Sequence, residues 1–193
     1  IRRSHVRRAI AARLGVDRAA ARRLARGVYV HLATSALELM RFGTHQGLSL
    51  EVEYRGGHHI DSALLQGRGA LVLTAHLGNW EALVRFGQQM PAPVHIVSRE
   101  MSSAFWQGAW GRLRDGGPSI LLAQGSGRRL VELLRGGQMV GFVLDQHAPG
   151  NDGCETRFLG RRAYTSRGLA RLAAMTGAPV VPMFTWREGH MHV

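Results

Sequence analysis

The sequence lacks lysine altogether, so its 25 basic residues are all arginine. Its single cysteine, Cys154, excludes a disulfide bond within the chain. No stretch approaches the roughly 18 consecutive apolar residues that a membrane-spanning helix needs, and no signal-peptide pattern is present. The chain is globular, because 45% of its 193 residues are hydrophobic. That content and length are enough for one domain with a sizeable core.

Acidic residues are also scarce, and the charge is unevenly distributed. The chain holds 13 Asp and Glu residues against 25 arginines, which gives a net charge of +12. Residues 1–26 contain nine arginines and one acid, Asp17, and so account for +8 of that charge. Such an excess favours an anionic partner, namely a nucleic acid, an acidic membrane face or an acidic protein. The alternative is a solvated surface on ordinary helices.

The first 42 residues predict a helical N-terminal segment. Apolar residues recur every four positions over residues 1–14, which is a helical spacing. Asp17 is a suitable N-cap for a second helix that runs to Arg26. A more apolar pattern over Val28–Phe42 predicts a third helix packed against the body. The first two helices are basic and amphipathic, a type that can meet anionic lipid or an acidic carrier.

Strand and helix patterns alternate through the rest of the chain. The expected strands are Ser49–Tyr54, Leu71–Ala75, Val94–Ser98, Ser119–Ala123, Met139–Leu144 and Pro179–Phe184. The expected helices are His58–Gln66, Asn79–Gln89, Ser102–Arg114, Gly127–Arg135 and Ser166–Thr176. Strands separated by helices predict an α/β domain with a mostly parallel central sheet flanked by helices.

We expect residues 1–193 to form a single domain, with the helical segment 1–42 at its start. We also expect the chain to be a fragment, because it begins with Ile1 rather than methionine and stops inside an expected strand. An N-terminal anchor and a C-terminal end would then lie outside it.

Polar residues gather at the carboxyl ends of the expected strands. They are His76, Arg99, Gln124, Asp145 and Gln146. Loops at these ends form the site in open parallel sheets. We therefore expect these residues to share one rim of the sheet.

His76 and Glu81 are the residues best suited to chemistry. Asn79 is a good N-cap, which places Glu81 in the first turn of the following helix. A carboxylate on Nδ1 of His76 would fix the tautomer and stabilise the imidazolium, which leaves Nε2 free to take a proton from a hydroxyl. Spacing alone, however, favours a structural role, with the histidine at a strand end and the glutamate at a helix start.

The string His76-Leu77-Gly78-Asn79-Trp80-Glu81 changes that balance. It resembles the His-x-x-x-x-Asp/Glu motif of glycerolipid acyltransferases, and more closely the His-x-Gly-Asn-Trp-Glu form of the bacterial lipid A biosynthesis acyltransferases. That family includes lauroyl and myristoyl transferases and is related to the phosphatidylinositol mannoside acyltransferases. Asp145-Gln146, Phe158-Leu159-Gly160 and Gly177–Pro182 follow in the family's order and approximate spacing. The resemblance covers roughly residues 28–190.

The resemblance implies an enzyme with a glycerolipid-acyltransferase-like fold. It would move a fatty acyl group from an acyl-carrier-protein thioester, or less often from acyl-CoA, to a hydroxyl of an anionic membrane glycolipid. A lipid A precursor is the first expectation for that acceptor, in lipopolysaccharide biosynthesis, and a phosphatidylinositol mannoside-type or other glycolipid is the alternative. The enzyme would act at the cytoplasmic face of the bacterial inner membrane. Neither a metal nor a cofactor beyond the donor is expected.

The resemblance also assigns roles to residues. His76 would be the general base and Glu81 its partner, and the substrate hydroxyl would attack the thioester without an acyl-enzyme. Backbone amides near Asn79, or Arg99, would stabilise the oxyanion. Asp145 and Gln146 would hydrogen-bond the acceptor or support the dyad. Arg99 could instead be a surface arginine, and Asp145-Gln146 could be a strand-terminating turn.

Weaker hypotheses concern other groups of residues. The arginines Arg157, Arg161, Arg162 and Arg167 could receive the phosphates of the acceptor, near a helix start capped by Thr165 or Ser166. They could equally be a solvated loop. The tryptophans Trp80, Trp106 and Trp110 could contact acyl chains, although core packing is the commoner role. The adjacent His58 and His59 cannot face one metal from a helix. Cys154 is expected to be an incidental thiol in a polar loop.

Three rival functions remain open on the sequence. The high charge suits a nucleic-acid-binding protein, although no recognised binding motif is present and we expect no nucleic acid partner. A hydrolase could use His76 and Glu81, but the Gly-x-Ser-x-Gly nucleophile elbow is absent. An inactive homologue that serves as a scaffold is the third.

Overall fold

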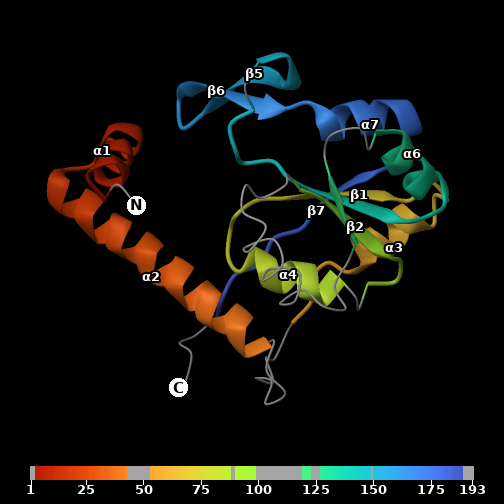
Figure 1. Ribbon diagram of the computed structural model, residues 1–193, viewed down its shortest axis with the longest axis horizontal. Helices are drawn as coiled ribbons and strands as arrows, with labels where there is room; N and C mark the ends of the chain where they lie inside the picture. Colours follow the sequence, from red (N-terminus) through yellow and green to blue (C-terminus); the bar gives the residue numbers. More distant parts are fainter. Residues whose placement is uncertain are drawn as a thin grey trace.

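The computed structural model describes residues 3–42, 53–87, 90–98, 119–122, 127–148 and 150–188. A layered α/β body carries a pair of N-terminal helices that extend to one side and a β-hairpin that projects above the sheet (Figure 1). The expected strand Ser49–Tyr54 lies mostly outside the described residues, and its residues 53–54 have no regular structure. The expected helix Ser102–Arg114 also lies outside the described residues.

Five parallel strands form the central sheet. They are β1 (Ala70–Thr74), β2 (Val94–Ser98), β3 (Ser119–Leu122), β4 (Met139–Val143) and β7 (Val180–Pro182). Their order is β3-β2-β4-β1-β7, and every neighbouring pair is parallel. β1 is almost wholly buried, as expected for a strand covered on both faces. The α/β class and the mostly parallel sheet are therefore confirmed.

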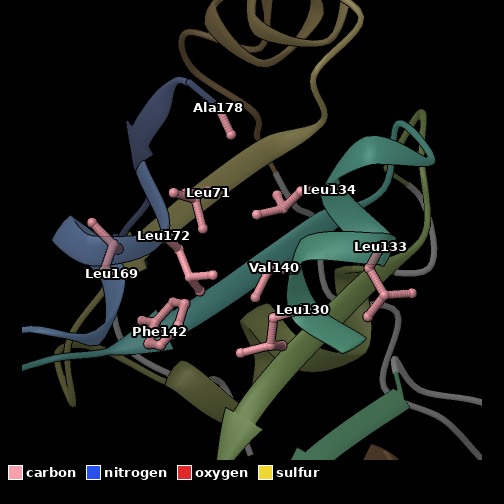
Figure 2. Close-up of a cluster of buried hydrophobic side chains, with 9 residues drawn as sticks. All are labelled: Leu71, Leu130, Leu133, Leu134, Val140, Phe142, Leu169, Leu172 and Ala178. Atoms are coloured by element: carbon pink, nitrogen blue, oxygen red, sulfur yellow. The ribbon is translucent and has the colours of Figure 1, made fainter. Parts of the chain in front are cut away.

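Two hydrophobic clusters hold helices on opposite faces of the sheet, because successive strand residues point to opposite sides. On one face, β1 and β4 contribute Leu71 and Val140, which pack with leucines of α6 (Gly127–Arg135) and α7 (Gly168–Thr176). Figure 2 shows this cluster. On the other face, Ala70, Val72 and Met139 pack with α3 (His58–Leu64), and Trp80 and Leu83 of α4 (Trp80–Phe86) lie beside Val72.

The N-terminal segment consists of two helices, α1 (Arg3–Leu14) and α2 (Arg18–Phe42). Asp17 caps α2 as expected, since its Oδ1 accepts a hydrogen bond from the Ala20 amide at 2.7 Å. The expected break near Gly27 is wrong: α2 is one helix of 25 residues. A single interior glycine costs a helix only about 1 kcal/mol, which contacts along the rest of α2 offset.

The segment around Cys154 also differs from expectation. A polar loop was expected, but β5 (Gly153–Phe158) and β6 (Arg161–Ser166) form an antiparallel hairpin, preceded by a short 3-10 helix, η2 (Gly150–Asp152). Both strands are largely exposed, so neither shows the alternation of apolar and polar residues that marks a half-buried strand. Because β6 extends to Ser166, α7 begins at Gly168 instead.

Candidate active site

The carboxyl ends of β1 and β4 place His76 and Asp145 side by side. Thr74, at the end of β1, lies opposite Val143, at the end of β4. His76 follows Thr74 by two positions, and Asp145 follows Val143 by two positions. A hydrogen bond of 3.1 Å from the Leu144 amide to the Thr74 carbonyl extends the pairing one step beyond the strands. Strand register therefore brings together two residues that are 69 positions apart in the sequence.

Asp145 holds His76 through both carboxylate oxygens. Oδ1 lies 2.7 Å from Nδ1 of the imidazole, and Oδ2 accepts the His76 backbone N–H at 2.9 Å. In the neutral ring, Nδ1 must carry the proton to donate to a carboxylate, so Nε2 is left with a free lone pair. The Gln146 amide nitrogen lies 3.4 Å from Nε2, which is a weak contact.

The carboxylate on Nδ1 is thus that of Asp145, whereas the sequence had suggested Glu81. Glu81 does lie in the first turn of α4, but its side chain is buried and accepts the Trp80 indole N–H at 3.1 Å. The Trp80 ring in turn meets the His76 ring edge-on, with centroids 4.9 Å apart. Asp145 takes the position because strand register fixes its backbone beside His76, while Glu81 sits inside the following helix.

The turn after His76 has strict steric requirements. Gly78 has φ +63°, and a Cβ at this position would lie 1.8 Å from the Thr185 carbonyl oxygen. Only glycine therefore fits. Asn79 caps α4 as expected, because its Oδ1 accepts the Ala82 amide at 3.2 Å.

A buried polar network ties this turn to α2 and to the chain after β7. The Glu38 carboxylate accepts hydrogen bonds from Nδ2 of Asn79 at 2.6 Å and from Nε and Nη2 of Arg187 at 2.7 and 2.8 Å. Arg187 also donates to Ser35 Oγ, again at 2.7 Å. Three segments far apart in the sequence are thus joined at one carboxylate.

His31 of α2 completes the network. Its Nδ1 lies 2.7 Å from Nη1 of Arg187, and its Nε2 lies 2.8 Å from the Gly78 carbonyl oxygen. Arginine can only donate, so in this geometry Nδ1 accepts and Nε2–H donates. The sequence offered one signal for the network, since Glu38 is the only acid in α2.

The network controls the ionisation of Glu38. Burial alone would raise the pKa of its carboxyl, but the hydrogen bonds from Arg187 and Asn79 and the charge of Arg187 outweigh burial, so the pKa lies below its usual value. The pKa of Arg187 is raised in return, mainly by its hydrogen bond to Glu38. Both groups are therefore charged across the physiological range.

A groove of about 720 Å³ runs between α2 and the turn after His76. Its lining is mainly apolar and includes Leu24, Val28 and Leu32 from α2 together with His76 and Leu77. Arg23 is the one basic residue of the lining. His76 therefore borders a space that can hold an alkyl chain.

A second, much narrower space of about 30 Å³ lies beneath α4 and has an almost wholly apolar lining. Thr74 and Trp80 line it close to His76, and Met90 and Ile96 line it further into the body.

Several expected site residues are placed elsewhere or lie outside the described part of the chain. Arg99, Gln124, Trp106 and Trp110 are outside it. Three of the four arginines gather near the tip of the β5–β6 hairpin, but Arg167 does not join them. The register pairs Arg157 with Arg162, near the tip of the β5–β6 hairpin, whereas Arg167 follows its base. Ser166 accepts the Gly168 amide at 3.2 Å, although the residue at the N-cap of α7 is Arg167.

The described ranges contain neither a candidate metal-binding cluster nor a membrane-spanning helix. Within them, no group of three or more His, Cys, Asp or Glu side chains could hold a metal ion. The rings of His58 and His59 lie 4.0 Å apart, centroid to centroid. None of the helices in those ranges has the length and hydropathy to cross a membrane.

Fold and site together define an α/β protein with a carboxylate-held histidine that faces an apolar groove. The whole chain, residues 1–193, matches the family described as bacterial lipid A biosynthesis acyltransferases, and it belongs to that family. It is also similar to two curated sequences named phosphatidylinositol mannoside acyltransferase, from Mycobacterium tuberculosis strains CDC 1551 / Oshkosh and ATCC 25618 / H37Rv. Each is 29% identical over 139 residues, which is 69% of this chain but 44% of the relative's length.

The His76–Asp145 geometry predicts the tautomer of the imidazole. Nitrogen NMR of the neutral ring should show the proton on Nδ1 in the native protein, and on Nε2 when Asp145→Ala removes the carboxylate. His76→Gln assigns the signal among the 10 histidines, and Asp61→Ala on the exposed face of α3 serves as the control. An Nε2–H tautomer in the native protein would contradict the geometry.

The Glu38 network predicts a pH-dependent loss of stability. Glu38→Gln should lower the free energy of unfolding at neutral pH by on the order of 3 kcal/mol, because Arg187 is left without its counter-ion. The fold lowers the pKa of Glu38, so its contribution is complete above the unfolded value of about 4.5 and is lost as pH falls through the folded pKa. Denaturant unfolding at several pH values measures both effects.

The exposed Glu132 on α6 supplies the matched control. Glu132→Gln should change the free energy of unfolding by no more than about 0.5 kcal/mol. If the Glu38→Gln penalty is as large well below pH 4.5 as at neutral pH, the ion pair is not its source.

Proposed function

We propose that the protein transfers a fatty acyl group from a carrier-bound thioester to a hydroxyl of a membrane glycolipid. One observation carries the proposal: Nδ1 of His76 is fixed by Asp145, and the ring opens on an apolar groove. Membership of the bacterial lipid A biosynthesis acyltransferase family supports the same activity. Fatty acyl chains belong to both donor and acceptor, so an apolar groove beside the base suits either.

In the proposed mechanism, Nε2 of His76 removes the proton from the acceptor hydroxyl as its oxygen attacks the thioester carbonyl. Asp145 stabilises the imidazolium that forms, and Glu81 supports the site through the Trp80 indole. Collapse of the tetrahedral intermediate expels the thiolate, which takes the proton back from the imidazolium, so the products are an ester and a free thiol. Backbone amides near Asn79, or Arg99, are the proposed stabilisers of the oxyanion.

The acceptor we propose is a lipid A precursor, in line with the family description. A phosphatidylinositol mannoside-type glycolipid is the second candidate, favoured by the names of the two mycobacterial relatives. Both acceptors are anionic lipids with free hydroxyls, so they make the same demands on His76. The proposed location is the cytoplasmic face of the bacterial inner membrane, where thioester donors and lipid acceptors meet.

Acyl carrier protein is the proposed donor partner, with acyl-CoA as the alternative. The charge supports an acidic partner, since α1 contains no acid among its arginines and α2 has only Glu38. Complementary charge of this kind raises the rate of encounter more than it raises affinity. The groove beside Arg23 opens on the same helix, so a carrier docked along α2 would deliver its thioester close to His76.

The direct test is acyl transfer by the full-length protein in detergent. Donor thioester is supplied with either a lipid A precursor or a phosphatidylinositol mannoside, and the acylated product is measured by mass spectrometry. His76→Ala should lower the transfer rate by about 10²–10⁴-fold, which is the usual contribution of a general base. The acceptor that yields product decides between the two candidates.

His59→Ala is the matched control, because His59 is an exposed histidine on α3 and belongs neither to the His76–Asp145 pair nor to the lining of the groove. It should transfer acyl groups at the native rate. Equal rates for native protein and His76→Ala would refute the mechanism, and no transfer by the native protein with any donor would favour an inactive homologue.

A further inference from the structure

The β5–β6 hairpin ends in two exposed apolar side chains. Phe158 is 69% exposed and Leu159 is 50% exposed, and neither belongs to a core cluster. The hairpin projects from the body, and its tip points toward α1 (Figure 1). A hydrogen bond of 3.4 Å from Arg161 to the Ala12 carbonyl oxygen holds the tip beside that helix.

The backbone at the tip adopts a conformation that is unfavourable for leucine. Phe158 pairs with Arg161, so Leu159 and Gly160 form a two-residue turn, with φ of +49° and +71°. Turns of this type favour Asn-Gly, because asparagine tolerates positive φ and a leucine does not. Leu159 remains 50% exposed and belongs to neither core cluster, so core packing does not compensate for this strain. An unfavourable backbone retained without a packing reason points to a function for the side chain.

Basic residues surround the apolar tip. Arg157, Arg161 and Arg162 flank it, and Glu155 pairs with Arg162 as the only acid of the two strands. The neighbouring α1 adds further arginines and no acid. In the described part of the chain, no carboxylate pairs with Arg157 or Arg161. Phe158 and Leu159 are therefore surrounded by arginines from the β5–β6 hairpin and from α1, two segments that are distant in the sequence.

We propose that this tip is a membrane-contact element, in which Phe158 and Leu159 enter the interfacial region of an anionic bilayer while the flanking arginines bind lipid phosphates. A narrow convex projection suits a bilayer, which can close around it. A stable protein partner would need a larger and flatter surface. The proposal goes beyond the proposed function, because the contact requires nothing of His76.

The test is flotation of the protein with vesicles of phosphatidylglycerol and phosphatidylethanolamine, compared with pure phosphatidylcholine vesicles. Leu159→Asn removes the apolar side chain and suits the turn, and Phe158→Thr keeps a residue that favours strands. The double variant should partition into anionic vesicles about tenfold less than the native protein. Leu65→Gln, at an 87% exposed leucine beside α3, should partition like the native protein.

Acyl transfer to a detergent-dispersed acceptor separates membrane contact from catalysis. The tip variants should keep the native rate there, because detergent delivers the acceptor without a bilayer. Native-like flotation of the double variant overturns the proposal, as does equal binding of the native protein to neutral and anionic vesicles. A raised KM for the acyl-carrier-protein thioester with unchanged flotation would assign the tip to the carrier and overturn the membrane contact.

Discussion

The bond between Glu38 and Arg187 is the constraint on which the site depends. The buried Glu38 carboxylate of α2 accepts hydrogen bonds from Asn79, the cap residue of α4, and from Arg187, in the chain after β7. Breaking such a pair leaves a charge without a partner in a poorly solvated place, so each segment holds the other two in position. The turn that follows His76 is fixed on both sides as a result, because His31 holds the Gly78 carbonyl and Thr185 packs against the same glycine.

The sheet supplies the other half of the geometry. Parallel pairing of β1 with β4 sets His76 beside Asp145, and the carboxylate then fixes both the backbone and the ring of the histidine. The sheet thus positions His76, the proposed base, and the polar network positions the helix that lines the groove. In the proposed reaction the protein contributes an oriented base and a shaped space, and the substrate contributes the nucleophile.

The sequence predicted the features that depend on local pattern and strand ends. Apolar runs predicted all five strands of the sheet, and the rule that parallel strands end at one edge brought His76, Asp145 and Gln146 to a common rim. The sequence did not predict which carboxylate reaches Nδ1 of His76. That depends on the register between β1 and β4, which pairs residues 69 positions apart. The contact between Glu38 and Arg187 spans 149 residues, and the exposed β5–β6 hairpin has no hydrophobic alternation, so neither left a periodic signal.

The proposed reaction depends on direct attack by the acceptor hydroxyl, with His76 as the base. The most direct measurement is the intact mass of the native protein after incubation with donor thioester, first without acceptor and then with it. Direct attack predicts an unmodified protein mass in both cases, with acylated product formed only when the acceptor is present. A protein heavier by one acyl group, formed without acceptor and discharged when acceptor is added, would contradict it.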